Sequence, residues 1–173
     1  ISKSEIDNNK NFENLRYEGY GPFNTAIIIE SLTDNKNRSA SSIRTILQKR
    51  GGRLGETGST KHLFFNCGVI HLDKKVCSDE EAFEFASNIG AKDCYNFETY
   101  HEIISDKEDF YKLKNKFEKK FNNLKYSGIE WRPLNFIDLN TEQKEKIVEV
   151  LENLEELDDV QNIYTNANLE VET

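Results

Sequence analysis

Two helix-start signals in the middle of the chain constrain its fold more than any other feature of the sequence. Ser78 with Glu81, and Ser105 with Glu108, have the spacing of a capping box, in which two side chains satisfy free backbone N–H groups of a helix's first turn. Apolar residues follow each pair at three- and four-residue intervals, the period of a helix that buries one side. We therefore predict one helix beginning at each box.

The segments around these two helices are predicted to be strands. Residues 93–97 and 100–104 are short and close together, as the strands of a hairpin are. An apolar run precedes the first helix, and another strand follows the second helix near residue 131. From about residue 69 to residue 131 the order is strand, helix, strand, strand, helix, strand, which is the ferredoxin-like arrangement.

The segments on either side of this stretch are each too small to cover a sheet by themselves. On the N-terminal side, Ser39 is predicted to cap a helix that Gly51 and Gly52 end. On the C-terminal side, Asn140 and Gln143 have the spacing of a helix start. The strands expected beside these helices are 24–32, 61–66, 131–139 and 160–164.

We predict an α+β fold of two ferredoxin-like domains, one inserted into the other. Residues 15–68 and 129–169 form the discontinuous domain, residues 69–128 form the inserted domain, and residues 1–14, which have little periodicity, form a flexible lead-in. Short connections at both junctions favour this topology. Two domains that follow one another along the chain are the alternative.

Positive charge is concentrated in one window of an acidic chain. The sequence has 31 Asp and Glu against 23 Lys and Arg, a net charge of −8, yet no carboxylate lies between Asp34 and Glu56. Local positive charge binds nucleic-acid phosphates by releasing their counterions, even when the whole protein is acidic. We predict that the helix in this window and its loops bind RNA; ordinary solvated side chains are the alternative. The basic residues are Lys36, Arg38, Arg44, Lys49, Arg50 and Arg53.

A second lysine-rich segment lies on the helix predicted after Ser105. Its lysines alternate with the residues of the buried side, so the solvated side of an amphipathic helix explains them more simply than a second binding surface does. They are Lys112, Lys114, Lys116, Lys119 and Lys120.

The sequence offers little material for catalysis or cofactor binding. A zinc site of His62, Cys67 and Cys77 would lack the usual paired thiols. The stretch GGRLGETGS has no lysine at P-loop spacing, and turns explain its glycines. We therefore predict a noncatalytic protein with no metal and no cofactor. Four carboxylates in motifs have the chemistry of a general acid and base, but caps and turns explain them more simply. They are Glu18, Asp34, Asp158 and Asp159.

Four strings of the sequence resemble the YebC family, which includes the mitochondrial translational activators of cytochrome c oxidase subunit I. The strings are LRYEGYGP, LTDNKNRS, GGRLGETGS and LDDVQNIYTNA, and their order and spacing match over about residues 15–168. The resemblance implies a three-domain protein whose second and third domains are ferredoxin-like. The family's lysine-rich N-terminal helical domain is absent from this sequence, which begins at Ile1 and contains no Met, so we expect a piece of a longer protein.

The resemblance also implies a function. Several members of the family are ribosome-associated factors that relieve stalling at proline-rich stretches, and the older label is transcriptional regulator. We therefore expect a noncatalytic, monomeric translation factor whose partners are the ribosome or ribosomal RNA and mRNA, with a DNA-binding transcriptional regulator as the alternative. No apolar run is long enough for a membrane span. A mitochondrion or plastid is the expected compartment, and a bacterial cytoplasm is the alternative.

The first motif contributes further candidate residues. In the family context, Tyr17, Tyr20 and Gly21 are expected to form a loop that offers aromatic faces to bases, while buried packing of the tyrosines is the alternative. The family continues Gly-Pro with two glycines, whereas this chain has Phe23 and Asn24. Side chains at these positions are expected to restrict any close backbone approach there.

Overall fold

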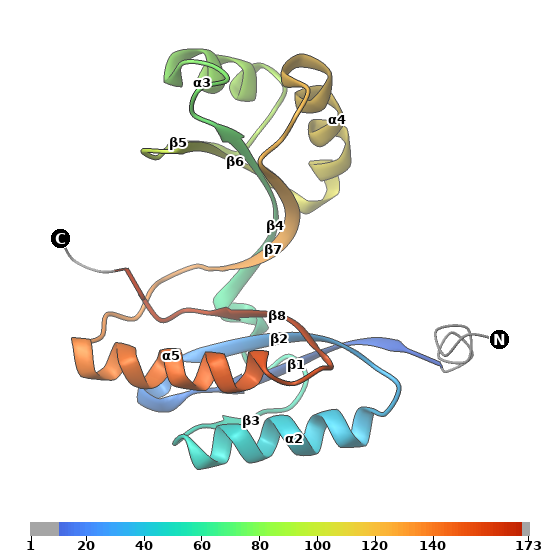
Figure 1. Cartoon of the computed structure of the whole chain (residues 1–173), viewed down its shortest axis with the longest axis vertical. Helices are drawn as coiled ribbons and strands as arrows, with labels where there is room; N and C mark the ends of the chain where they lie inside the picture. Colours follow the sequence, from blue (N-terminus) through green and yellow to red (C-terminus); the bar gives the residue numbers. More distant parts are fainter. Residues whose placement is uncertain (1–10, 171–173) are drawn as a thin grey trace. The chain divides into compact units, whose positions relative to one another are not determined.

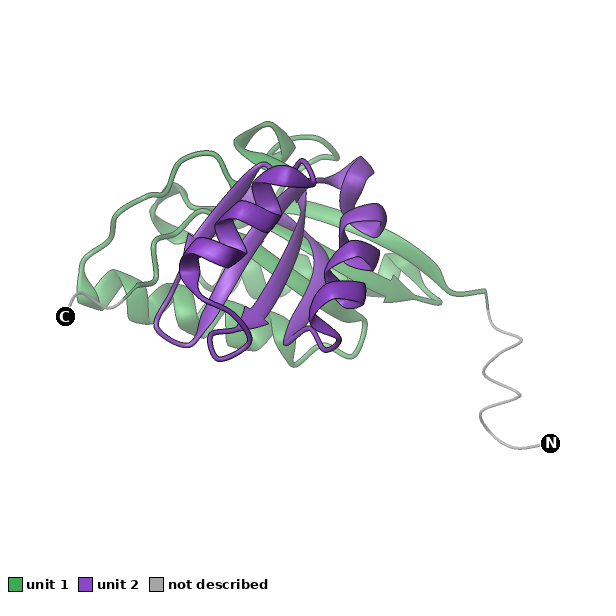
Figure 2. Ribbon diagram, turned by 90° about the horizontal axis from the view of Figure 1, so that it is seen from above, with its two compact units in different colours: residues 1–65, 133–173 green, residues 66–132 purple. Residues whose placement is uncertain are grey.

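The computed structural model describes residues 11–170 of the chain. The protein is a mixed α+β protein with two four-stranded antiparallel sheets, one in each of two compact units (Figure 1). Unit 1 consists of residues 1–65 and 133–173, and unit 2 of residues 66–132, so the sequence of unit 2 interrupts that of unit 1 (Figure 2). No helix in the described range is long and apolar enough to cross a membrane.

The sheet of unit 1 has the strand order β3-β1-β2-β8. One of its two inner strands, β2, carries the run AIII, and these four residues are fully buried on both faces of the sheet. Two helices close one face, and Ile27, Ile29, Ile43, Leu47 and Val150 form a core between sheet and helices. The elements are β1 (Glu13–Tyr20), β2 (Ala26–Thr33), α2 (Lys36–Lys49), β3 (Arg53–Leu54), α5 (Thr141–Glu155) and β8 (Val160–Thr165).

Two strands of this sheet differ from the expected ones. β1 was expected to be lead-in and loop, but it pairs with β2 from Glu13 opposite Thr33 to Tyr20 opposite Ala26. Its polar sequence gives no strand signal, and backbone hydrogen bonds to the buried strand β2 hold it in place. Of the expected lead-in, residues 1–10 lie outside the described residues. The prediction that 61–66 and 131–139 belong to this sheet is wrong, since β1 and β3 occupy those places.

Unit 1 therefore runs strand, strand, helix, strand, helix, strand along the chain, which is not the ferredoxin-like order expected for it. Its first helix also begins earlier than predicted. The Asn35 side chain caps α2 by accepting the N–H of Arg38, whereas Ser39 lies inside the first turn and is buried. The C-terminal helix α5 begins with the predicted capping box of Asn140 and Gln143.

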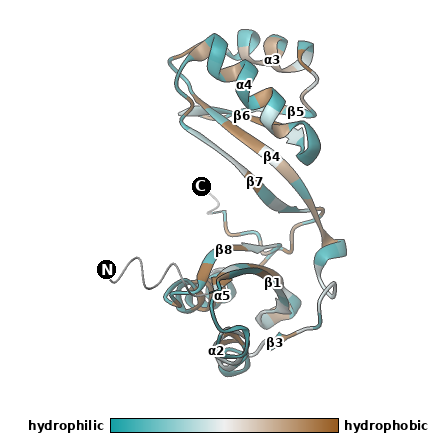
Figure 3. Cartoon of the chain, turned by 90° about the vertical axis from the view of Figure 1, so that its right-hand side faces the viewer, coloured by the Kyte–Doolittle hydropathy of each residue, from teal (hydrophilic) through white to brown (hydrophobic). Residues whose placement is uncertain are grey.

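Unit 2 runs strand, helix, strand, strand, helix, strand, with the strand order β5-β6-β4-β7. Both helices lie on the same face of this sheet (Figure 3). Ile70, Leu72 and Ile103 point from the sheet into the core, where Leu113 and Phe117 meet them. The elements are β4 (Phe64–Asp73), α3 (Asp79–Asn88), β5 (Asp93–Asn96), β6 (Tyr100–Asp106), α4 (Phe110–Phe121) and β7 (Tyr126–Pro133).

Of the two capping boxes predicted in the middle of the chain, the first forms the hydrogen bond from the backbone to the serine, and the second does not form. Ser78 caps α3 by accepting the N–H of Glu81, and the hairpin of β5 and β6 is paired. Ser105 instead lies in β6, buried beside Gly68 and Phe110, and its hydroxyl has no hydrogen-bond partner in the described part of the chain. A 3-10 turn separates it from α4, so strand pairing overrides the local helix-start signal.

Candidate nucleic-acid interface

Helix α2 places the predicted basic residues on the surface of unit 1. Ile43 and Leu47 are buried against the sheet, so the remaining sides of the helix face outward. No acidic residue lies in the helix, and all six predicted basic side chains of the window are exposed. Their availability to a ligand therefore depends on what each one contacts.

Arg38 uses its charge within unit 1. Its Nη2 lies 2.7 Å from Asp34 Oδ1 and 3.1 Å from both carboxylate oxygens of Asp159. Asp159 also accepts the hydroxyls of Ser39 at 2.6 Å and Thr33 at 3.2 Å. Burial raises the pKa of Asp159, but the hydrogen bonds from Ser39 and Arg38 outweigh it and leave the pKa below its usual value. Arg38 thus ties the start of α2 to the segment before β8, which makes it a structural residue.

Arg50 also has a partner, although a weaker one. Its Nη1 lies 3.2 Å from Glu149 Oε2 on α5, and both side chains are exposed. Exposed ion pairs of this kind contribute about 0–1 kcal/mol, because solvent and salt screen them. Arg50 is therefore partly neutralised on the surface, in contrast to its expected role as a free cation.

Four cations of the window have no ion pair in the described part of the chain. One is Arg53; the other three, Lys36, Arg44 and Lys49, lie on α2, and we call them the α2 face. The helical period spreads them, with Arg44 and Lys49 about 140° apart around the axis and Lys36 about 20 Å from Lys49 along it. The α2 face is therefore positive, but its charges are widely spaced. Such spacing suits separate contacts along a phosphate backbone better than it suits the binding of one small anion.

The first and third sequence motifs meet at one hollow of about 350 Å³ at the end of α2. The Arg53 guanidinium lies 4.8 Å from the centre of the Tyr20 ring, a cation–π contact. Gly52 must be glycine, because a Cβ there would lie 2.0 Å from the Tyr20 carbonyl oxygen. The lining residues are Tyr20, Gly21, Phe23, Asn24, Gly51, Gly52 and Arg53.

The two tyrosines of the first motif belong to β1 and make structural contacts. The Tyr17 hydroxyl donates to the Lys36 carbonyl at 3.0 Å, and its ring packs against the core of unit 1. The Tyr20 hydroxyl donates to the Ser59 carbonyl at 3.2 Å. These contacts agree with the alternative in which the tyrosines pack within the protein. Of the expected binding loop, the hollow lined by Tyr20 and Gly21 remains as a candidate.

Phe23 and Asn24 occupy a backbone region that favours glycine. Their φ angles are 64° and 59°. For a residue with a side chain this conformation costs about 1–2 kcal/mol. These are the positions where the family pattern has its two glycines, so the difference noted in the sequence lies at a strained turn of the hollow.

Glu18 fixes the glycine-rich loop to the sheet. Its side chain is buried, and its carboxylate accepts the backbone N–H groups of Gly58 at 2.6 Å, Thr60 at 3.1 Å and Lys61 at 2.6 Å. Burial raises the pKa of Glu18, but these hydrogen bonds lower it by more than burial raises it, so the pKa is below its usual value. The carboxylate organises a loop, as the simpler interpretation of this residue expected.

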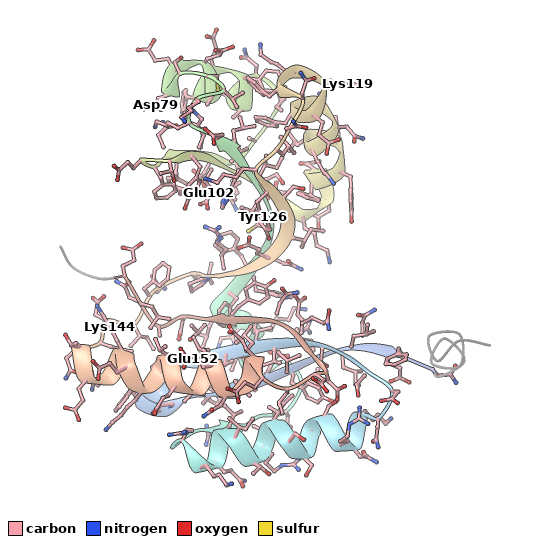
Figure 4. The ribbon with its side chains drawn as sticks, in the orientation of Figure 1. Asp79, Glu102, Lys119, Tyr126, Lys144 and Glu152 are labelled. Atoms are coloured by element: carbon pink, nitrogen blue, oxygen red, sulfur yellow. The ribbon has the colours of Figure 1, made fainter. Side chains whose placement is uncertain are left out.

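Helix α4 carries a second group of exposed lysines, as its sequence indicated. Lys112, Lys116 and Lys119 are exposed and have no ion pair in the described residues, and the helical period places them within about 60° and about 10 Å of one another. Lys119 lies on the outer side of α4 (Figure 4). By contrast, Lys114 pairs with Glu118 at 3.8 Å, and Lys120 lies 4.9 Å from the Phe85 ring.

His101 and Cys67 are buried and serve in packing. His101 is fully buried between Asn96 Oδ1 at 2.7 Å and the Cys77 carbonyl at 2.9 Å. Cys67 is buried, which raises the pKa of its thiol to about 11. Across residues 11–170, no three His, Cys, Asp or Glu side chains are grouped as metal ligands.

The fold and this surface define the class: a two-unit α+β protein with exposed basic helices and side-chain networks that serve structure. Residues 12–167 match the family model described as the second and third domain of TACO1/YebC. The chain belongs to this family, as its motifs indicated.

Several relatives of known sequence are bacterial and are named as probable transcriptional regulatory proteins. The chain is 46% identical over 168 residues to a probable transcriptional regulatory protein of Pelagibacter ubique, covering 97% of this chain and 70% of the relative. It is 42% identical over 167 residues to one of Rickettsia akari, covering 96% and 66%. A crystal structure of a conserved hypothetical protein from Aquifex aeolicus is similar with a TM-score of 0.83 at 36% identity, over 93% of this chain and 67% of that one. The chain thus spans about two thirds of the length of these proteins.

Proposed function

We propose that this chain is a noncatalytic, monomeric regulatory protein that binds nucleic acid through the α2 face, and that its partner is the ribosome through ribosomal RNA, with mRNA as a further partner. One observation carries the proposal: three unpaired cations lie on a helix without acids, in a chain of net charge −8. Each phosphate that they neutralise releases counterions, so the local charge decides binding. Arg53, exposed beside Tyr20, extends the surface into the hollow.

Backbone contacts rather than base reading fit this helix. α2 lies against the sheet and α5, and within residues 11–170 no preceding α-helix stands beside it as in a helix-turn-helix. A helix that offers three scattered cations to a polyanion recognises shape and charge, which favours structured RNA. The second candidate is a DNA-binding transcriptional regulator, and the names of the bacterial relatives favour it.

We add two further proposals, one on the fold and one on the cellular compartment. We assign unit 2 to the ferredoxin-like class on its element and strand order. We also propose the division expected from the sequence, with residues 69–128 inserted between 15–68 and 129–169, bounds that differ by three and four residues from those of unit 2 (66–132). The bacterial relatives favour a bacterial cytoplasm over the mitochondrion or plastid expected from the sequence.

Co-sedimentation with ribosomes tests the proposal. We compare Lys36→Glu/Arg44→Glu/Lys49→Glu on α2 with Lys112→Glu/Lys116→Glu/Lys119→Glu on α4, a matched control with the same change in net charge on another helix. We expect the α2 variant to lose co-sedimentation and the α4 variant to retain most of it. Equal loss of co-sedimentation in both variants would contradict an interface on the α2 face. If the protein binds duplex DNA with a preference among sequences and does not bind ribosomes, the second candidate is favoured.

A further inference from the structure

Four aromatic rings form a continuous row on unit 2, at the side of the sheet that bears no helix. The ring centres of Phe97 and Tyr100 are 4.9 Å apart, those of Tyr100 and His71 4.4 Å, and those of His71 and Tyr126 5.2 Å. These residues, which we call the aromatic row, come from the β5–β6 turn, β6, β4 and β7. Side chains alternate along a strand, so His71 points away from the core that its neighbours Ile70 and Leu72 fill.

A buried ionic network holds the middle of the row. Glu102, 5% exposed, lies opposite His71 in the β4–β6 register and contacts His71 Nε2 at 2.8 Å. Arg132 binds the same carboxylate through two contacts of 2.9 Å. A buried charge is expensive to desolvate and needs such partners. Here the partners fix the orientation of the His71 ring between the two tyrosines.

The ends of the row are open to solvent. Phe97 is 43% exposed and Tyr126 is 41% exposed. The Tyr126 ring lies along the sheet over Gly128, because a Cβ at Gly128 would meet its hydroxyl at 2.5 Å and its ring at 3.1 Å. A glycine beneath a ring leaves the opposite ring face free to stack. Figure 4 labels Tyr126 and Glu102 on the sheet of unit 2.

The charged groups on and beside this face are two cations and four carboxylates, so attraction of phosphates does not drive binding and the rings determine what it binds. Arg132 contacts both Glu102 and, at 3.4 Å, Glu130. Lys125 adds a cation 5.7 Å from the centre of the Tyr100 ring, whereas Asp93 and Glu98 are exposed anions nearby in the hairpin. Unpaired bases of any sequence stack on aromatic side chains, because every base has a π-face, and four-stranded sheets with aromatic residues on the open face bind single strands in this way.

We propose that the aromatic row binds unpaired bases of a single-stranded nucleic acid, with one base on Tyr126, one on Phe97 and a phosphate beside Lys125. This inference rests on the proposed nucleic-acid function and adds to unit 2 a base-stacking site distinct in chemistry from the α2 face. Because stacking carries the contact, removal of the bases weakens binding here even when the charge of the strand is unchanged.

Fluorescence anisotropy with a labelled 12-nucleotide single-stranded RNA tests the site, with an abasic strand of equal length and charge as the probe for stacking. In the full chain we replace Tyr126 and Phe97 by Ala, singly and together, and use Tyr111→Ala on α4 as the control, since Tyr111 is 67% exposed and outside the row. Each lost stacked base is expected to weaken binding about 5- to 150-fold. Far-UV circular dichroism checks that the variants are folded.

The outcomes separate this inference from the proposed function. If the abasic strand binds as tightly as the RNA, or if Tyr126→Ala and Phe97→Ala bind as the control does, the stacking site is overturned, even where reversal of the α2 face abolishes binding. If the row variants weaken binding and the α2 variant does not, the stacking site stands and the proposed role of α2 fails. If a lysine-rich peptide displaces the RNA, and binding of the peptide is lost in Tyr126→Ala, the inference is overturned in favour of a cationic protein partner.

Discussion

Substitution of Glu18 by Gln is expected to destabilise unit 1 although it changes only one atom of the side chain. The carboxylate of Glu18 accepts three backbone N–H groups, at 2.6, 3.1 and 2.6 Å, and is 1% exposed. A hydrogen bond to a charged group contributes about 1 kcal/mol more than a neutral one, so three such bonds lose about 3 kcal/mol in total. The amide NH₂ of Gln would in addition face an N–H donor.

Urea denaturation followed by circular dichroism measures this loss. With an m value of about 2 kcal/mol/M, the midpoint should fall by about 1.5 M while m stays the same. Glu56→Gln is the matched control, because Glu56 lies in the same loop with an exposed side chain, and it should change stability by less than about 0.5 kcal/mol. If Glu18→Gln behaves like this control, the carboxylate does not hold the loop.

The pH dependence gives an independent check on Glu18. Its folded-state pKa is below the usual value, because the backbone hydrogen bonds outweigh burial. The stabilisation is therefore complete above the pKa of the unfolded state and is lost as the pH falls through the folded-state pKa. The difference in unfolding free energy between wild type and Glu18→Gln should shrink over that acidic range. A difference that stays constant would contradict the assigned cause.

The remaining predictions concern the strained turn and the network of unit 2. Phe23→Gly should be about 1–2 kcal/mol more stable than Phe23→Ala by urea denaturation, because only glycine relieves the positive φ of 64°; equal stability would show that the turn is unstrained. Arg132→Met should destabilise the protein by about 3–5 kcal/mol at neutral pH, since it leaves Glu102 buried without its main partner. That loss should diminish as the pH falls, because protonation of Glu102 removes the unpaired charge; a loss that is independent of pH would contradict this explanation.

Elements with local signals could be predicted from the sequence. The capping box of Asn140 and Gln143, the Ser78 cap and the hairpin of β5 and β6 each depend on residues close together in the chain. β1 could not be predicted in this way, because ENLRYEGY has no apolar run and becomes a strand by pairing with β2. Ser105 shows the converse, where a helix-start spacing is overridden by the strand that contains it.

The candidate site was harder to predict than the fold. The window from Lys36 to Arg53 lacks acids in sequence, but Asp159 reaches Arg38 across 121 positions and Glu149 reaches Arg50 across 99. Such long-range partners follow from the packing of α2 beside the end of α5 and the start of β8. An acid-free stretch of sequence is therefore not an acid-free surface, and two of the six expected cations are engaged.

The salt dependence of RNA affinity tests the role of the α2 face most directly. The slope of log K against log salt reports the number of phosphates neutralised, at about 0.7 per contact for a single strand and about 0.9 for a duplex. We expect Lys36→Gln/Arg44→Gln/Lys49→Gln to lower the slope by about 2–3, and Arg38→Gln to leave it unchanged because its charge is used by Asp34 and Asp159. An unchanged slope for the triple variant would contradict the account.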